Sequence, residues 1–133
     1  MPAPVRKNAA AAQAPSGGGG KPLLPGYVLR VTVENNQLVG TVVQPAGASD
    51  YQFIAPYELD PNDARVMYLA AGHTVWRNSN LDGIPTGNPD PTSTNWTQLT
   101  GSAVGAPKSH GVTALSVSKS PAGRLFFGTT NYQ

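Results

Sequence analysis

The chain has 133 residues, which is enough for one small domain with a core of its own, and 39% of them are hydrophobic. It has no cysteine, which excludes disulfides and thiolate-bound metals, and its 15 glycines and 13 prolines favour many turns over long helices. The formal net charge is only +2, and three of the nine Lys and Arg residues lie in residues 1–26, where there is no acid. The rest of the chain is nearly neutral and offers no clustered basic face, so we expect no nucleic-acid binding. No apolar run approaches the roughly 18 residues that span a bilayer, so no membrane span is expected.

Residues 1–26 are rich in Ala, Pro and Gly and include the run Gly17–Gly20. A segment of this composition cannot bury enough apolar area to offset the entropy lost on ordering, so we expect a disordered arm or linker. Order is predicted to begin with a β-hairpin over residues 27–44. Its strands are rich in valine and leucine, and Asn35-Asn36 can accept the positive φ angles of a tight hairpin turn.

The sequence predicts six further short strands, at Tyr51–Ala55, Val66–Ala70, Thr74–Arg77, Trp96–Leu99, Val112–Ser118 and Arg124–Thr129. The stretch Asp60–Asp63 has the proline and the flanking polar residues of a strong turn. Residues 78–94 are polar and rich in turn formers, so a long loop is expected there. No segment shows the 3.6-residue apolar period of a helix, and the chain is therefore predicted to be all-β.

An internal repeat becomes visible when the chain is shifted by 58 residues, which places residues 53–72 over residues 111–130. Met67-Tyr68-Leu69 then falls on Leu125-Phe126-Phe127, and the order strand, polar turn, apolar strand, small residue recurs. Units of this kind bury their faces by stacking on neighbouring units. We expect one complete unit at 51–100 and part of another at 111–133. The chain is therefore expected to be a piece of a longer protein, or to pair with something that completes the assembly.

From Asp60 onward the chain contains, in order, the motifs D-P-N-D, V-M-Y-L-A-A-G, T-V-W-R-N-S-N, W-T-Q-L-T, V-T-A-L-S-V-S-K-S-P and R-L-F-F-G-T. Over about Tyr51–Tyr132, the order of these motifs resembles that of the BNR or Asp-box β-propellers. Such sialidase-like repeats also occur in xyloglucanase-type glycoside hydrolases and sortilin-type receptor domains. The resemblance implies a partial β-propeller of about one and a half blades, preceded by the 27–44 hairpin and the N-terminal arm. It also implies a secreted or cell-surface protein.

The Asp-box of this family has roughly the pattern S-x-D-x-G-x-x-W, on a turn between two strands of a blade. By resemblance, its places are taken here by Ser79, Asp82, Gly83 and Trp96, with Leu81 where the family has its acid. The box ties a turn through hydrogen bonds from side chains to the backbone. The resemblance therefore implies a structural role for these residues and not a catalytic one.

Four of the seven acids lie in turn-forming contexts, namely Asp60, Asp63, Asp82 and Asp90. Their simplest role is to cap turns, whereas glycoside hydrolysis requires two carboxylates that face each other across a cleft. Glu58 lies in an apolar strand beside Tyr57, and strand alternation places these two side chains on opposite faces. His73, in a turn, and His110, in a loop, lack the spacing of metal ligands. We therefore predict no catalytic residue, no cofactor and no metal.

Four residues are candidate ligand contacts, namely Tyr57, Glu58, Trp76 and Trp96. Their aromatic rings could stack on sugars, or they could form the core between stacked units. The favoured hypothesis is a non-catalytic scaffold that recognises glycans or protein partners, completed by the remaining blades of a longer chain or by self-association. One alternative is a fragment of a glycoside hydrolase whose catalytic acids lie mostly elsewhere. Another is an assembly or virion-type structural protein.

Overall fold

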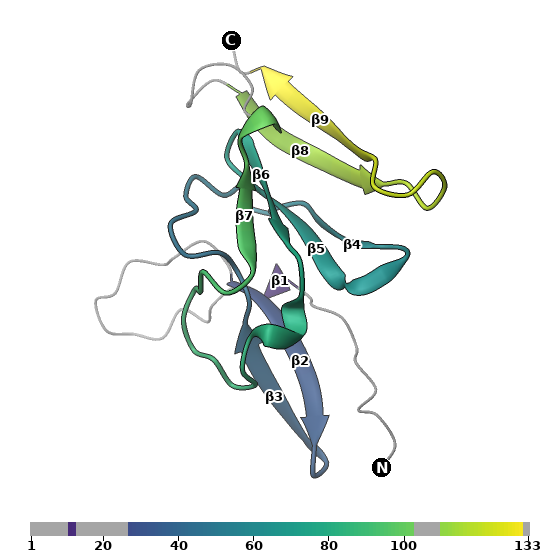
Figure 1. Cartoon of the computed structure of the whole chain (residues 1–133). Coiled ribbons are helices and arrows are strands. Elements are labelled where there is room, and N and C mark those ends of the chain that lie inside the picture. Colours follow the sequence, from purple (N-terminus) through teal and green to yellow (C-terminus); the bar gives the residue numbers. More distant parts are fainter. Residues whose placement is uncertain (1–10, 13–26, 103–109, 132–133) are drawn as a thin grey trace, which may run out of the picture.

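A computed structural model describes residues 11–12, 27–102 and 110–131 of the chain (Figure 1). Its regular elements are antiparallel strands and two single-turn 3₁₀-helices, which confirms the all-β prediction. Among the described residues, no helix is long and apolar enough to cross a membrane. The prediction of a disordered arm falls on residues 1–26, which lie outside the described residues except for 11–12.

The first hairpin is formed by β2 (Tyr27–Glu34) and β3 (Gln37–Val42), as predicted. Asn35 and Asn36 have φ angles of 49° and 61°, which are the positive values that a two-residue type I′ turn requires. The short strand β1 (Ala11–Ala12) pairs with the beginning of β2. The hairpin projects from the rest of the molecule, with its turn at the far end (Figure 1).

Four antiparallel strands, which pair in sequence order, form the central sheet: β4 (Tyr57–Asp60), β5 (Asp63–Ala71), β6 (Thr74–Asn78) and β7 (Trp96–Leu99). The turns at residues 61–62 and 72–73 lie where the sequence predicts them. The long connection from β6 to β7 is mostly irregular, as expected, and contains the 3₁₀-helix η1 (Leu81–Gly83). The 3₁₀-helix η2 (Thr100–Ser102) follows β7.

The predicted strand at Tyr51–Ala55 is wrong, because this segment is irregular and the strand begins only at Tyr57. Two apolar residues suggested the strand, but Phe53 and Ile54 are 78% and 74% exposed and have no layer to pack against. Pro56 has no N–H for a sheet ladder and contributes only its carbonyl, which accepts a hydrogen bond from Ala70 N at 2.9 Å.

The last hairpin is formed by β8 (His110–Val117) and β9 (Leu125–Asn131), so His110 begins a strand and does not lie in a loop as predicted. Its pairing repeats that of β4 and β5. In the central sheet the opposed pairs are Tyr57–Leu69, Glu58–Tyr68 and Leu59–Met67. In the last hairpin they are Leu115–Phe127, Ser116–Phe126 and Val117–Leu125, each residue displaced by 58 positions. The repeat in the sequence is therefore present in the register of the strands.

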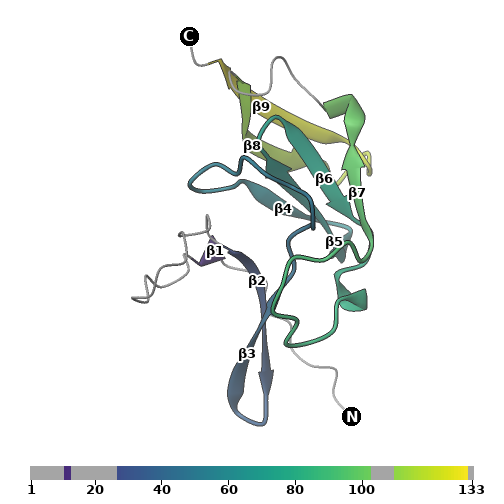
Figure 2. The same ribbon diagram turned by 90° about the vertical axis from the view of Figure 1, so that its left-hand side faces the viewer.

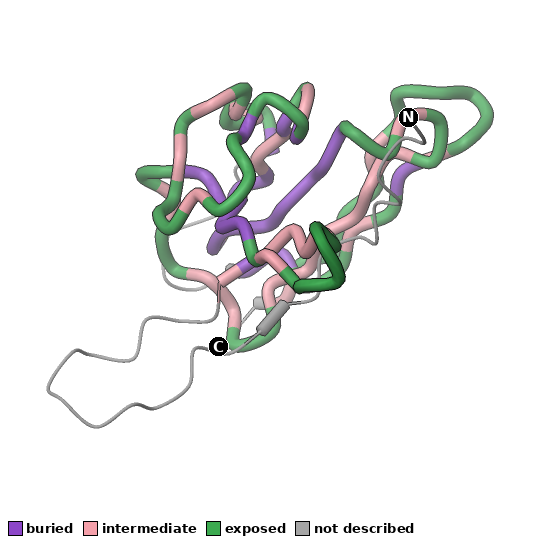
Figure 3. Tube along the Cα trace, turned by 90° about the horizontal axis from the view of Figure 1, so that it is seen from below, coloured by how far each residue is buried: buried purple, intermediate pink, exposed green. Residues whose placement is uncertain are grey.

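Strand β5 is buried on both of its faces, which explains its continuous apolar run. Side chains on one face join the β2-side core, which consists of Val28, Val43, Met67, Leu69, Leu81 and Ile84. Side chains on the other face join the β8-side core, which consists of Val66, Tyr68, Ala70, Val75, Val112 and Val117. Figure 2 shows β8 and β9 on one side of the central sheet, and Figure 3 shows the buried trace in purple between exposed turns. The central sheet is therefore the middle layer of three.

Candidate functional site

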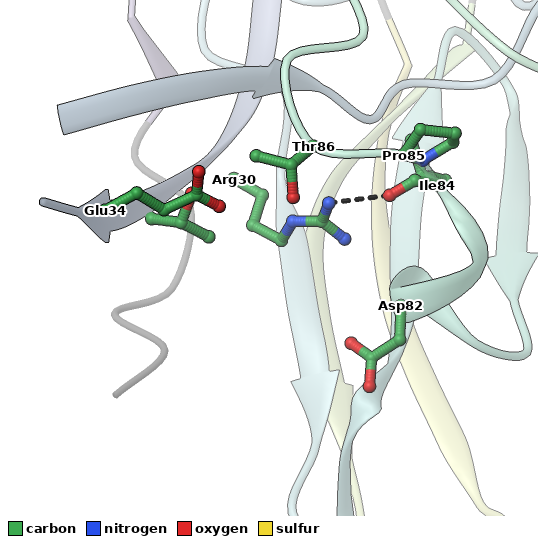
Figure 4. A pocket seen from close by; sticks show the side chains of 7 residues that line it. Arg30, Glu34, Asp82, Ile84, Pro85 and Thr86 are labelled. Carbon is green, nitrogen blue, oxygen red and sulfur yellow. Dashed lines mark hydrogen bonds between the residues drawn. The ribbon is translucent and has the colours of Figure 1, made fainter. Parts of the chain in front are cut away.

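A pocket of about 160 Å³ lies where β2 meets the connection between β6 and β7 (Figure 4). Its lining residues are Arg30, Thr32, Glu34, Asp82, Ile84, Pro85 and Thr86. On β2, the lining residues alternate at 30, 32 and 34 because every second side chain of a strand points to the same face. The other wall comes from η1 and the residues directly after it.

Arg30 joins the two walls of the pocket. Its guanidinium donates one hydrogen bond to the carbonyl of Ile84 at 2.6 Å and another to the carbonyl of Leu81. Leu81 is the first residue of η1, and its carbonyl also accepts a hydrogen bond from Ile84 N at 3.1 Å, while Ile84 directly follows η1. A planar guanidinium can reach both acceptors at once, which fixes η1 against β2.

Three asparagines hold η1 in place from the side of the central sheet. The Oδ1 atom of Asn80 accepts a hydrogen bond from Asp82 N at 3.1 Å, and that of Asn78 accepts one from Asn80 N at 2.9 Å. Asn95 Nδ2 donates to the carbonyl of Asn80 at 2.9 Å. A Cβ atom on Gly83 would lie 2.4 Å from Asn95 Nδ2, so any other residue at this position would displace the Asn95 side chain. The backbone of Asp82 is thereby fixed at the edge of the pocket.

The four residues of the expected Asp-box-like turn have different roles in the structure, and Asp82 donates its backbone N–H to Asn80 Oδ1. Ser79 donates its backbone N–H to the carbonyl of Asn95 at 3.0 Å, and Gly83 allows the close approach of Asn95. Trp96 donates its indole N–H to the carbonyl of Val43 at 2.7 Å. The side chains that accept from the backbone of the turn are those of Asn78 and Asn80. Sequence reasoning missed them, although alternate asparagines are a signal for successive Asx turns.

Two carboxylates, Glu34 and Asp82, line the pocket from different elements, and both residues are exposed. Figure 4 shows them on different sides of the Arg30 guanidinium. Glu34 was not among the candidate ligand contacts, since it ends a strand and nothing local marks it. The carboxylates accept hydrogen bonds, and the hydroxyls of Thr32 and Thr86 can both donate and accept. This set of groups suits a small ligand that carries several hydroxyl groups.

The candidate ligand contacts from the sequence do not line this pocket. Tyr57 and Trp76 both lie opposite Leu69 in the register, so their side chains share one face of the central sheet. Tyr57 and Trp96 pack against the β2-side core. Of the two roles considered from the sequence, sugar stacking and core packing, this corresponds to core packing. Glu58 lies opposite Tyr68 on the other face, as strand alternation predicts. The structure therefore does not bring Glu58 together with the three aromatic residues.

A second polar group lies on the β8 side of the central sheet. Arg77 Nε donates to the hydroxyl of Tyr68 at 3.3 Å, and the Arg77 guanidinium carbon lies 5.9 Å from the centre of the Tyr68 ring. Tyr68 is only 6% exposed. This arrangement combines a cation–π contact with a hydrogen bond and stabilises the pairing of β5 with β6.

Asp63 and Tyr51, whose pKa values are shifted, do not line the pocket. The Arg65 side chain donates two hydrogen bonds to Asp63, and together with the Arg65 backbone N–H it lowers the pKa of Asp63 to about 2. Burial raises the pKa of Tyr51 to about 12. In the described ranges, no three His, Asp or Glu side chains gather closely enough to hold a metal ion.

Comparison with known proteins gives no relative for this chain: no protein-family model matches it, no curated protein is similar to it, and no solved structure matches its fold. The resemblance to BNR repeats therefore rests on sequence motifs, and the function must be argued from the site itself.

Proposed function

We propose that this chain is a non-catalytic scaffold segment of the β-propeller type, from a secreted or surface protein with BNR repeats, and that it recognises glycans or protein partners. The observation that carries the proposal is the register shared by the pairs β4–β5 and β8–β9 at a displacement of 58 residues. A propeller blade is a four-stranded antiparallel sheet packed between neighbouring blades. The strand order of the central sheet and the cover on both of its faces are consistent with that arrangement.

The packing of β5 supports a role as a rigid support. Met67 and Leu69 are fully buried on one side, and Ala70 is 2% exposed on the other. Each buried large aliphatic side chain contributes about 1.5–3 kcal/mol to stability. A middle layer that is held from both sides keeps the surrounding loops in fixed positions, and ligand-binding groups are commonly carried on such loops.

The pocket at Arg30 supports glycan recognition as the specific activity. Sugar hydroxyls donate to carboxylates such as Glu34 and Asp82, and they both donate to and accept from hydroxyls such as those of Thr32 and Thr86. A volume of about 160 Å³ suits a single sugar unit of a longer glycan, with the remainder lying along the exposed surface. Since none of the described residues that line the pocket is aromatic, recognition here depends on hydrogen bonds and not on stacking.

The test is binding of a panel of neutral and acidic glycans by calorimetry, with three variants compared. Asp82→Asn and Glu34→Gln each replace one carboxylate of the pocket by an amide, and we expect either change to weaken binding about tenfold, because a hydrogen bond to a charged group is worth about 1.5–3 kcal/mol. Asp90→Asn makes the same chemical change at an exposed acid outside the pocket, and it should leave affinity unaltered. Equal affinities for all three variants would refute the assignment of the pocket.

A second candidate function is glycoside hydrolysis, because Glu34 and Asp82 line the same pocket and such enzymes use two carboxyl groups. A catalytic acid is usually kept protonated by an apolar surrounding, whereas both residues here are exposed. Recognition without hydrolysis is therefore the better supported function. Incubation with β-glucan and sialoside substrates decides between the two: hydrolysis that is lost in Glu34→Gln or Asp82→Asn would establish the enzyme.

A further inference from the structure

The two edges of β9 differ from those of its counterpart in the central sheet. The 58-residue displacement of the register makes β9 the counterpart of β5 and β8 the counterpart of β4. Strand β5 pairs with β4 along one edge and with β6 along the other, from Met67–Asn78 to Ala71–Thr74. Within the described part of the chain, β9 pairs only with β8. The edge that corresponds to the β6 side of β5 therefore presents backbone groups that a further strand can pair with.

Side-chain exposure changes in the same way between the two strands. Tyr68 and Leu69 on β5 are 6% and 0% exposed, while their counterparts Phe126 and Phe127 on β9 are 60% and 36% exposed. Contiguous exposed aromatic residues on a strand are typical of a surface that binds another polypeptide. Strand β9 is as apolar as an inner strand of a sheet, but in the described part of the chain it is an edge strand.

We propose that the free edge of β9 binds an antiparallel β-strand with the residue pattern of β6, which is Thr-Val-Trp-Arg-Asn. The inference rests on the repeat that also underlies the proposed function, but it concerns a different surface from the pocket. The β5–β6 pairing gives the register: the residue at the Trp76 position lies opposite Phe127, and the arginine at the Arg77 position lies opposite Phe126. This mode of recognition adds a strand to a sheet, with backbone hydrogen bonds for affinity and side chains for specificity.

The arginine is the feature that selects this occupant. In the central sheet the Arg77 guanidinium lies 5.9 Å from the centre of the Tyr68 ring. Phe126 occupies the equivalent place on β9, so a bound strand with an arginine in this position covers the exposed ring by the same cation–π contact. Because phenylalanine has no hydroxyl, the contact on β9 lacks the hydrogen bond that Arg77 makes to Tyr68.

Two experiments test the proposal on the full chain. In the first, a fluorescein-labelled peptide with the sequence of residues 72–79 is titrated with the protein, and binding is followed by fluorescence anisotropy. We expect Phe126→Asp to weaken binding at least about tenfold, since it removes the cation–π contact and the apolar cover. Leu38→Asp is the matched control, because Leu38 is 76% exposed on β3, in the hairpin that projects away from the rest of the molecule (Figure 1). A peptide with Arg77 replaced by glutamate should bind more weakly than the original.

In the second experiment, a copy of residues 74–102 is appended after Gln133, which raises the effective concentration of the added strand. Hydrogen exchange of the amides in residues 125–129 should slow by at least about tenfold relative to the unmodified chain. Unchanged exchange together with absence of peptide binding would overturn the proposal. So would a dimer of the unmodified chain that Phe126→Asp dissociates, because a second copy would then hold the edge. Loss of glycan binding at the pocket leaves both readouts at β9 unaffected, so the two proposals fail separately.

Discussion

Trp96 donates its indole N–H to the backbone carbonyl of Val43 at 2.7 Å and so joins the central sheet to the segment that follows β3. The two residues are 53 positions apart, and Val43 is fully buried. Trp96 also packs against the β2-side core. The sequence allowed Trp96 to be either a ligand contact or a core residue. In the structure it connects two layers of the fold.

We expect Trp96→Phe to lower the free energy of unfolding by about 1–3 kcal/mol, because the ring is largely kept while a buried carbonyl loses its donor. Urea denaturation measures the change. Trp76→Phe is the matched control, since the Trp76 side chain is half-buried and its indole makes no hydrogen bond among the described residues. Equal losses in the two variants would show that the hydrogen bond contributes nothing specific.

The contact between Gly83 and Asn95 gives a prediction with its own internal control. Gly83→Ala places a methyl group 2.4 Å from Asn95 Nδ2, so the Asn95 side chain must move and its hydrogen bond to Asn80 is lost. We expect a loss of about 1–2 kcal/mol in unfolding free energy.

Asn95→Gly removes that side chain, and glycine readily adopts the φ of 61° found at this position. Adding Gly83→Ala to Asn95→Gly should therefore cost much less than Gly83→Ala alone, in a double-mutant cycle read by urea denaturation. Additive losses would indicate that the methyl group clashes with something else.

The pair Asp63–Arg65 predicts a change in titration. The pKa of Asp63 is lowered from 3.8 to about 2, first by the side-chain hydrogen bonds from Arg65 and then by the Arg65 backbone N–H. Arg65→Met should raise the pKa of Asp63 but leave it below 3.8, since the backbone donor remains. Carboxyl carbon NMR across pH 1.5–6 measures the shift.

The sign of the effect on stability follows from the same pair. A carboxyl whose pKa is lowered in the folded state stabilises that state above pH 3.8, and the contribution is lost as the pH falls toward about 2. The side chains are 56% and 37% exposed, so solvent and salt screen the interaction and the stability change should be small. A large loss of stability in Arg65→Met at pH 7 would contradict this account.

Tyr51 predicts a second pH dependence, at the alkaline end. Burial raises its pKa from 10.0 to about 12, and its buried hydroxyl has no hydrogen-bond partner among the described residues. A raised pKa means that the unfolded chain releases the proton first, so this contribution to stability is complete below about pH 10 and is lost as the pH rises through about 12. In Tyr51→Phe the loss between pH 10 and 12 should be smaller, and stability at pH 7 should be equal or higher, because an unpaired buried hydroxyl is removed. Thermal melts across that range test both expectations, and lower stability of Tyr51→Phe at pH 7 would contradict the second.

The strands and turns that the sequence predicted correctly are those with strong local signals. Asn35 and Asn36 tolerate positive φ angles, and the turn at residues 61–62 follows from proline next to asparagine. The run at β5 is apolar on both faces, and the structure covers both faces. The strand predicted at Tyr51–Ala55 was wrong because it also rested on a local signal. The apolar residues predicted a strand, but no partner strand lies alongside among the described residues. Strand formation requires an edge to pair with, and that edge is not encoded in five residues.

The amino-acid sequence by itself determined the all-β class, the positions of the hairpins and the 58-residue repeat, because turn chemistry and alternation act over a few residues and recur wherever the same pattern recurs. Only the tertiary structure decided that Glu34 and Asp82 line one pocket, that Arg30 binds the carbonyls of η1, and that Trp96 binds Val43. These contacts join residues about fifty positions apart. They depend on how three layers pack on one another, and packing is set by the shapes of whole faces rather than by the local preferences of any single segment.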